Sequence, residues 1–95
     1  MRALYGELFD ATAALLFRHD PISISFDNPN ADEYAPEVET ILPRLSTCQS
    51  TDEALHVVHE EFIRWFGAET AGPRQRYEQI AVEIWQLWQG SGKGR

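Results

Sequence analysis

Residues 50–67 read Ser-Thr-Asp-Glu-Ala-Leu-His-Val-Val-His-Glu-Glu-Phe-Ile-Arg-Trp-Phe-Gly, and they carry the start, the buried face and the end of one helix. Ser50 and Glu53 have the spacing of a capping box, in which both side chains accept hydrogen bonds from main-chain N–H groups at the helix start. Gly67 suits the helix end because glycine adopts left-handed backbone angles without strain. Val57 is expected to point away from the core. The helical period of the apolar positions predicts a buried face of Leu55, Val58, His59, Phe62 and Phe66.

Three other segments have the apolar spacing of helices. Residues 2–18 form the first, and residues 36–47 form the second, with Pro36 in its first turn and Pro43 inside it. Residues 73–89 form the last. The buried positions predicted for the second and last helices are Val38, Ile41, Leu42, Leu45, Tyr77, Ile80, Ala81, Ile84 and Trp88. The chain therefore predicts an all-α fold, a small four-helix array in which a long, irregular, acidic connection joins the first two helices.

We expect one helical domain over residues 1–90 and a flexible Gly-rich tail over residues 91–95. The connection has no basic residue between Arg18 and Arg44, and it supplies six of the seven net negative charges. Its acids are Asp20, Asp27, Asp32, Glu33, Glu37 and Glu39. Within it, residues 22–26 alternate apolar and polar side chains, which is typical of a strand. Because no second strand is predicted, this segment either packs on the helices or pairs with another chain.

Composition argues against several classes of protein. A net charge of −7 disfavours binding to nucleic acid phosphates and to anionic membranes. No stretch approaches the roughly 18 apolar residues that a membrane-spanning helix needs. Cys48 is the one cysteine, so no disulfide forms within the chain, and a reducing cytoplasm is expected.

The candidates for metal binding and catalysis are weak. His56 and His59 lie three residues apart, but Glu60 does not stand where the zinc-protease motif places its glutamate. A metal or small-ligand site would need a further group such as His19 or Asp20, and the simpler interpretation makes His59 a core-face residue with one hydrogen-bond partner. Cys48 has no local signature of a nucleophile. We therefore predict no catalytic residue, no metal and no cofactor.

The residues with no structural task in the helical pattern are the best candidates for binding a partner. We predict that Asp32, Glu33, Tyr34 and Glu37 bind a partner protein. Tyr34 has two interpretations, because it either packs back on the second helix or forms an aromatic hot spot surrounded by carboxylates. Trp65 and Trp85 flank their apolar faces, where such side chains close the edge of a core or anchor an interface.

Short motifs in the first half of the chain resemble those of the YugE-like family, a group of small, uncharacterised helical bacterial proteins. The motifs are His19-Asp20-Pro21-Ile22, Asp32-Glu33-Tyr34-x-Pro36-Glu37-Val38 and Ile41-Leu42. The resemblance implies an all-α fold and a soluble bacterial protein. It supplies no catalytic residue.

The function predicted from the sequence is that of a non-enzymatic, acidic interaction module that docks on the basic surface of a partner protein. An immunity- or antitoxin-type inhibitor is one protein of this kind. Two alternatives remain open. One is a metal- or ligand-binding helical protein that uses His19, Asp20, His56 or His59, and the other is a homodimer that pairs through residues 22–26.

Overall fold

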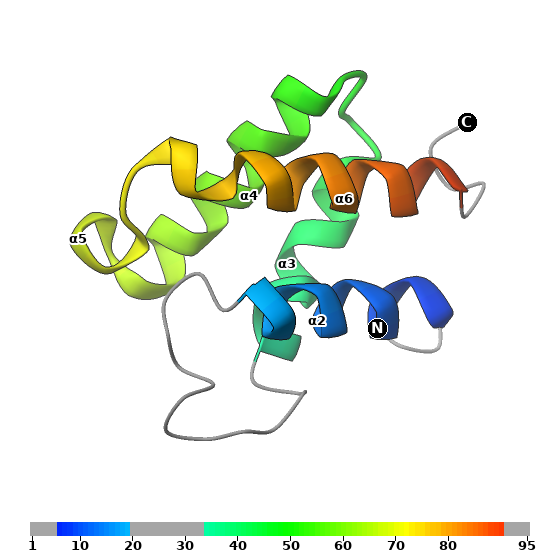
Figure 1. Ribbon diagram of the computed structural model, residues 1–95, viewed down its shortest axis with the longest axis horizontal. Coiled ribbons are helices and arrows are strands. Elements are labelled where there is room, and N and C mark those ends of the chain that lie inside the picture. The colour runs from blue at the N-terminus through cyan, green and yellow to red at the C-terminus, as the bar shows by residue number, and fades with distance from the viewer. Residues whose placement is uncertain (1–5, 20–33, 91–95) are drawn as a thin grey trace.

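The computed structural model describes residues 6–19 and 34–90, and every regular element in this part of the chain is helical (Figure 1). The all-α fold class is therefore confirmed. The extended segment predicted over residues 22–26 lies outside the described residues, as does most of the acidic connection. The elements are α2 (Glu7–His19), α3 (Ala35–Leu45), α4 (Thr51–Phe66), the short α5 (Ala68–Ala71), the 3-10 turn η2 (Arg74–Tyr77) and α6 (Glu78–Gly90).

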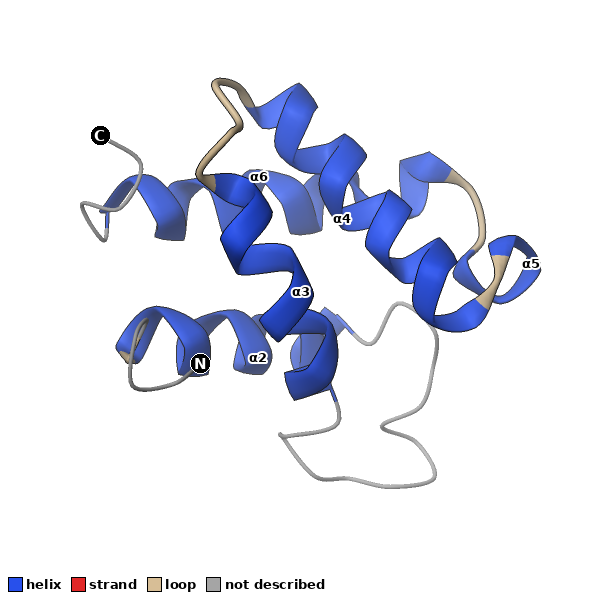
Figure 2. Ribbon diagram, turned by 180° about the vertical axis from the view of Figure 1, so that it is seen from behind, coloured by secondary structure: helices blue, strands red, loops and turns tan. Residues whose placement is uncertain are grey.

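The four long helices enclose one core. Contacts run from α2 to α3, from α3 to α4, from α4 to α6, and from α6 back to α2. Helices α2 and α6 lie in front in Figure 1. Figure 2 shows the molecule from behind, and there α3 and α4 lie in front. The molecule thus has an α2–α6 face and an opposite α3–α4 face.

Helix α4 begins and ends as the sequence predicts. The Ser50 hydroxyl accepts a hydrogen bond from the Glu53 N–H at 3.2 Å, and the Glu53 carboxylate accepts one from the Gln49 N–H. The carboxylate therefore reaches one residue further back than in the standard capping box. At the other end, Gly67 has φ of 87°, and its N–H donates to the Ile63 carbonyl at 2.7 Å.

Helix α4 buries more of its surface than the sequence predicts. Val57, which we expected to point away from the core, is buried, whereas Phe66 is only partly buried. The reason is that α4 packs against α3 and against α6. A helix between two neighbours buries two sides, whereas periodicity alone identifies one.

The connection from α4 to α6 also differs from the prediction. The last helix begins at Glu78 rather than at residue 73, because Gly72 has φ of 81° and Pro73 is extended. The η2 turn follows, and its Tyr77 hydroxyl donates a hydrogen bond to the Ala71 carbonyl. This bond holds the connection against the core.

Helix α3 brings its predicted apolar face into the core: Val38, Ile41, Leu42 and Leu45 are all fully buried. It ends at Leu45, two residues earlier than predicted. The hydroxyls of Ser46 and Thr47 donate hydrogen bonds to the carbonyls of Pro43 and Arg44, which satisfies acceptors in its last turn. The exposed side of this helix contributes to the site described next.

Candidate functional site

The residues predicted to bind a partner do not come together on the described surface. Tyr34 is fully buried, and its ring packs against Phe62 of α4 with 5.9 Å between the ring centroids. Glu37, in the first turn of α3, is buried as well. Neither side chain is exposed to a partner. Both therefore belong to the core and not to the predicted docking surface. Asp32 and Glu33 lie outside the described residues.

Trp65 is the large apolar side chain that the described surface exposes, with 45% of its area accessible. Its indole is nonetheless fixed, because Nε1 donates a hydrogen bond to Oγ1 of Thr40 on α3 at 3.0 Å. The Thr40 hydroxyl in turn donates to the Glu37 carbonyl at 2.9 Å. An exposed aromatic side chain that is held in one position loses little conformational freedom on binding, which is a property of interface anchors.

Next to the indole, a buried carboxylate is held by two arginines. Oε2 of Glu61, whose side chain is 2% exposed, accepts hydrogen bonds from Arg44 at 2.6 Å and from Arg64 at 3.2 Å. Arg44 also donates to the Glu60 carboxylate at 2.6 Å, and His56 lies 3.3 Å from the other oxygen of Glu60. A carboxylate as buried as Glu61 requires such partners, because an uncompensated charge in the core is strongly unfavourable.

The ion pairs of this cluster shift the pKa of two groups. Burial opposes the charged form of Arg44, but its hydrogen bonds to Glu61 and Glu60 outweigh that effect and raise its pKa. The hydrogen bond from Arg44 lowers the pKa of Glu60. Both groups therefore stay charged at neutral pH.

The indole and the cluster border a common hollow of about 260 Å³, lined by Thr40, Glu61, Arg64 and Trp65. Pockets for small-molecule ligands are typically about 300–1,000 Å³, so this hollow is smaller than a typical ligand pocket. We call the surface formed by Thr40 of α3 and by Glu61, Arg64 and Trp65 of α4 the tryptophan face.

A second, more polar hollow of about 460 Å³ lies between the end of α3 and the start of α4. It contains Cys48, whose pKa is raised by burial and by the nearby Glu53 carboxylate. A raised pKa leaves the thiol protonated at neutral pH, and a thiol is a poor nucleophile compared with a thiolate. This environment does not favour catalysis by Cys48.

The three histidines are in separate places. His19 pairs with Glu83 at 2.9 Å, His56 lies beside Glu60, and His59 is hydrogen-bonded to the Gly72 carbonyl at 3.0 Å. His59, predicted to be a core-face residue with one hydrogen-bond partner, is partly buried, contacts the Tyr77 ring and has that partner in the Gly72 carbonyl. Across residues 6–19 and 34–90, no three side chains of the metal-ligating types come together.

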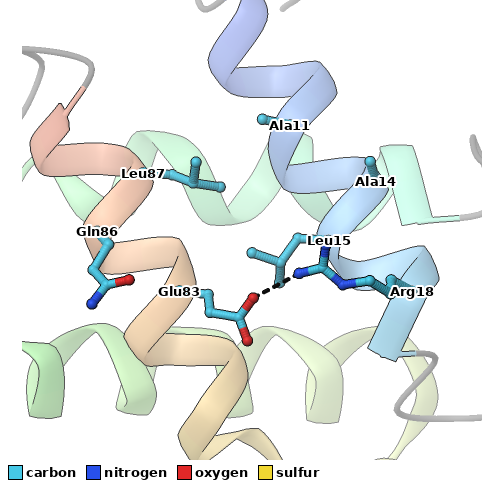
Figure 3. Close-up of a pocket in the computed structure, with 7 residues that line it drawn as sticks. All are labelled: Ala11, Ala14, Leu15, Arg18, Glu83, Gln86 and Leu87. Atoms are coloured by element: carbon cyan, nitrogen blue, oxygen red, sulfur yellow. Dashed lines mark hydrogen bonds and ion pairs between the residues drawn. The ribbon is translucent and has the colours of Figure 1, made fainter.

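On the opposite side of the molecule, α2 and α6 border an apolar groove. Figure 3 shows Ala11 and Leu15 of α2 pointing toward α6 and Leu87 of α6 pointing toward α2, and the Arg18–Glu83 ion pair of 2.7 Å bridges the two helices. Two adjoining hollows of about 380 and 350 Å³ lie along it and share Ala11, Gln86 and Leu87. The groove can take up apolar side chains but has few polar groups to orient a substrate.

None of the protein-family models, curated proteins or solved structures compared with this chain matches it. The resemblance to the YugE-like family therefore stays a prediction. Within the part of the chain that the structure describes, no helix has the length and apolar character needed to cross a membrane.

Proposed function

We propose that this protein is a non-enzymatic interaction module that binds the basic surface of a partner protein through the tryptophan face. The observation that carries the proposal is the fixed, exposed indole of Trp65. Tryptophan is among the residues most enriched in binding hot spots. Its hydrogen bond to Thr40 holds the ring in position before any partner arrives.

The charge of the described residues supports a basic partner. Eleven carboxylates and five arginines give them a net charge of −6. Arg18, Arg44, Arg64 and Arg74 each bind a carboxylate of the same chain. Arg76 donates to the carbonyls of Thr70 and Ala71. Because the carboxylates outnumber the arginines, the long-range field of these residues is negative, which speeds encounter with a positively charged surface.

The same features fit an inhibitor of the immunity or antitoxin type that acts in the cytoplasm, in which a small acidic protein covers a basic active site. The surroundings of Cys48 and the separation of the histidines favour binding over catalysis. On the acidic connection, Asp32 and Glu33 are retained as partner-binding residues, together with Glu39 on α3. Tyr34 and Glu37 are not retained, because their side chains are buried.

The test compares two variants of equal charge in association with the purified partner. Glu33→Gln with Glu39→Gln removes two of the carboxylates proposed to bind the partner, and Glu7→Gln with Glu78→Gln removes exposed carboxylates on α2 and α6. At low salt we expect the first pair to reduce the association rate about tenfold and the second pair to have a much smaller effect. Equal effects of the two pairs would mean that only the net charge of the molecule matters, and would contradict Glu33 and Glu39 as partner-binding residues.

A second candidate function is a homodimer, and the α2–α6 groove favours it over pairing through residues 22–26. Glu7, Ala11, Ala14 and Arg18 follow one another at spacings of four, three and four, so they share one side of α2, and all four line the groove hollows. If two copies of α2 packed antiparallel about a two-fold axis, Ala11 would face Ala14 of the other copy. Glu7 would then face Arg18, so the ends are complementary in charge.

The mass in solution tests this second candidate. A dimer has twice the 10.9 kDa of the chain, and Ala14→Glu should convert it to a monomer because a carboxylate replaces a methyl group at the centre of the contact. Gln75→Glu, on the exposed surface of η2, is the control for added charge. A wild-type protein that stays monomeric at high concentration would contradict the homodimer.

A further inference from the structure

The hollow beside Trp65 has an unusual chemical lining. The indole and Glu61, whose carboxylate is buried, both line it, together with Thr40 of α3. An aromatic ring next to a carboxylate is a suitable environment for a cation, because both the ring face and the carboxylate oxygens carry negative potential. The fourth lining residue, Arg64, already supplies a cation to it.

The two arginines that bind Glu61 are held very differently. Arg44 comes from α3, approaches to 2.6 Å and is also bound to Glu60. Arg64 comes from the same helix as Glu61, approaches only to 3.2 Å and is 71% exposed. Arg64 can move into solvent while Glu61 keeps its shorter bond to Arg44, so the buried carboxylate is not left without a partner. Arg44 is fixed, whereas Arg64 is replaceable.

We propose that an arginine side chain of the partner enters this hollow, takes the place of Arg64 on Glu61 and stacks against the indole of Trp65. This proposal rests on the protein-binding function proposed above and names the group that the tryptophan face recognises. When Arg64 moves away, Glu60 and Glu61 carry two negative charges against the single positive charge of Arg44. The incoming guanidinium restores the balance.

Arginine fits this site better than lysine. Its planar guanidinium can stack on an aromatic ring while it donates hydrogen bonds to a carboxylate in its own plane, whereas an ammonium is more strongly hydrated and binds as a point charge. The hollow, of about 260 Å³, is also smaller than typical pockets for small-molecule ligands. The partner is therefore a protein with an exposed arginine at the centre of a basic surface.

The experiment uses the peptide acetyl-Gly-Arg-Gly-amide as the probe and the indole N–H signal of Trp65 in nuclear magnetic resonance spectra as the readout. We expect a saturable shift of that signal with a dissociation constant on the order of millimolar, since a single side chain is bound. The same peptide with lysine should bind about threefold more weakly. The peptide with citrulline, which has the shape of arginine without its charge, should not bind.

Two pairs of variants test the mechanism. Arg64→Ala should tighten peptide binding about threefold because it removes the internal competitor, while Arg74→Ala changes the charge equally at the Asp52 ion pair and should leave the affinity unchanged. Glu61→Gln should weaken binding about tenfold, and Glu78→Gln should not. Thermal melting verifies that each variant is folded, and Trp65→Phe identifies the indole signal.

The proposal is overturned if citrulline binds as well as arginine, or if Arg64→Ala has no more effect than Arg74→Ala. These results are distinguishable from failure of the protein-binding function. If the peptide does not bind but Trp65→Ala still weakens association with the natural partner, only the arginine site is wrong. If the peptide binds as expected and no partner depends on Trp65, the arginine site stands and the proposed function is wrong.

Discussion

The Arg44 guanidinium on α3 and the buried Glu61 carboxylate on α4 lie 2.6 Å apart, and this ion pair joins the two helices beneath the tryptophan face. Arg44 ends the acidic connection, and its partner Glu61 lies seventeen residues later in the chain. Nothing in the local sequence predicts this pairing. The pair connects the stability of the fold to the geometry of the proposed site.

Loss of this ion pair should destabilise the protein. Arg44→Ala leaves Glu61 in the core with only the weaker bond from Arg64, so we expect the free energy of unfolding to fall by about 2–3 kcal/mol, less than for a fully enclosed pair because Arg44 is partly exposed. Urea denaturation measures this change. Arg74→Ala, which breaks the exposed pair with Asp52, should cost less than about 1 kcal/mol. Equal losses in the two variants would argue against a structural role for the Arg44–Glu61 pair.

The acid stability of the protein should depend on Glu83. The hydrogen bond from His19 lowers the pKa of this carboxyl below its ordinary value of 4.5. A carboxyl whose pKa is lower in the folded protein stabilises the fold above its ordinary pKa, and this contribution is lost as the pH falls through the lowered value. The wild-type protein should therefore lose stability below about pH 4.5, and Glu83→Gln should make that loss smaller.

Urea midpoints measured between pH 5.5 and pH 3 test this dependence. Glu78→Gln is the matched control, because Glu78 has no ion pair within the described residues. If both glutamine variants keep the wild-type pH dependence, the pairing of His19 with Glu83 does not govern acid stability.

Cys48 should react slowly with thiol reagents. Burial, followed by the nearby Glu53 carboxylate, raises the pKa of its thiol, so less thiolate is present at pH 8 than in a free cysteine. Alkylation by iodoacetamide, followed by mass spectrometry, should be several-fold slower than alkylation of glutathione under the same conditions. Glu53→Gln should increase the rate. Alkylation faster than that of glutathione would indicate an activated thiol and would reopen the case for catalysis.

Gly67 and Gly72, the glycines at the two ends of α5, should differ in how well they tolerate an added side chain. Both have positive φ, so alanine at either position strains the backbone, which costs about 1–2 kcal/mol. At Gly67 an added Cβ meets open space, whereas at Gly72 it would lie 2.6 Å from Cζ of Arg76. Gly72→Ala should therefore be the more destabilising by about 1 kcal/mol, because Arg76 must give up its hydrogen bond to Ala71. Equal unfolding midpoints for the two variants would contradict this.

The features that the sequence predicts well are those decided by neighbours along the chain. The capping box at Ser50, the helix end at Gly67 and the buried stripe of α3 all follow from local spacing and backbone chemistry. Val57 was assigned to the wrong environment, because whether a second side of α4 is covered depends on α3 and α6.

The candidate site was predicted less well for the same reason. Tyr34 stands among charged residues in the sequence but packs against Phe62, which lies on another helix. Trp65 was identified only as a flanking residue with two possible roles. Its exposure and its hydrogen bond to Thr40 depend on how α3 and α4 pack, which local periodicity does not specify. The acidic character of the chain, in contrast, follows directly from its amino-acid composition.

The contribution of Trp65 to binding can be separated from its contribution to stability. The side chain is 45% exposed, so Trp65→Ala removes the buried part of the indole as well as the surface hydrogen bond to Thr40, and we expect it to cost about 2–3 kcal/mol of stability. Urea denaturation measures this cost, and binding is compared under conditions in which both proteins are folded.

The most direct test of the proposed function is to compare what wild-type protein and Trp65→Ala capture from extracts of the cells that make the protein. Each captured protein is then purified and its affinity measured by calorimetry. We predict a basic partner whose affinity falls at least tenfold with Trp65→Ala and weakens as salt is raised. A partner that binds wild type and Trp65→Ala equally well would contradict the tryptophan face as the binding surface.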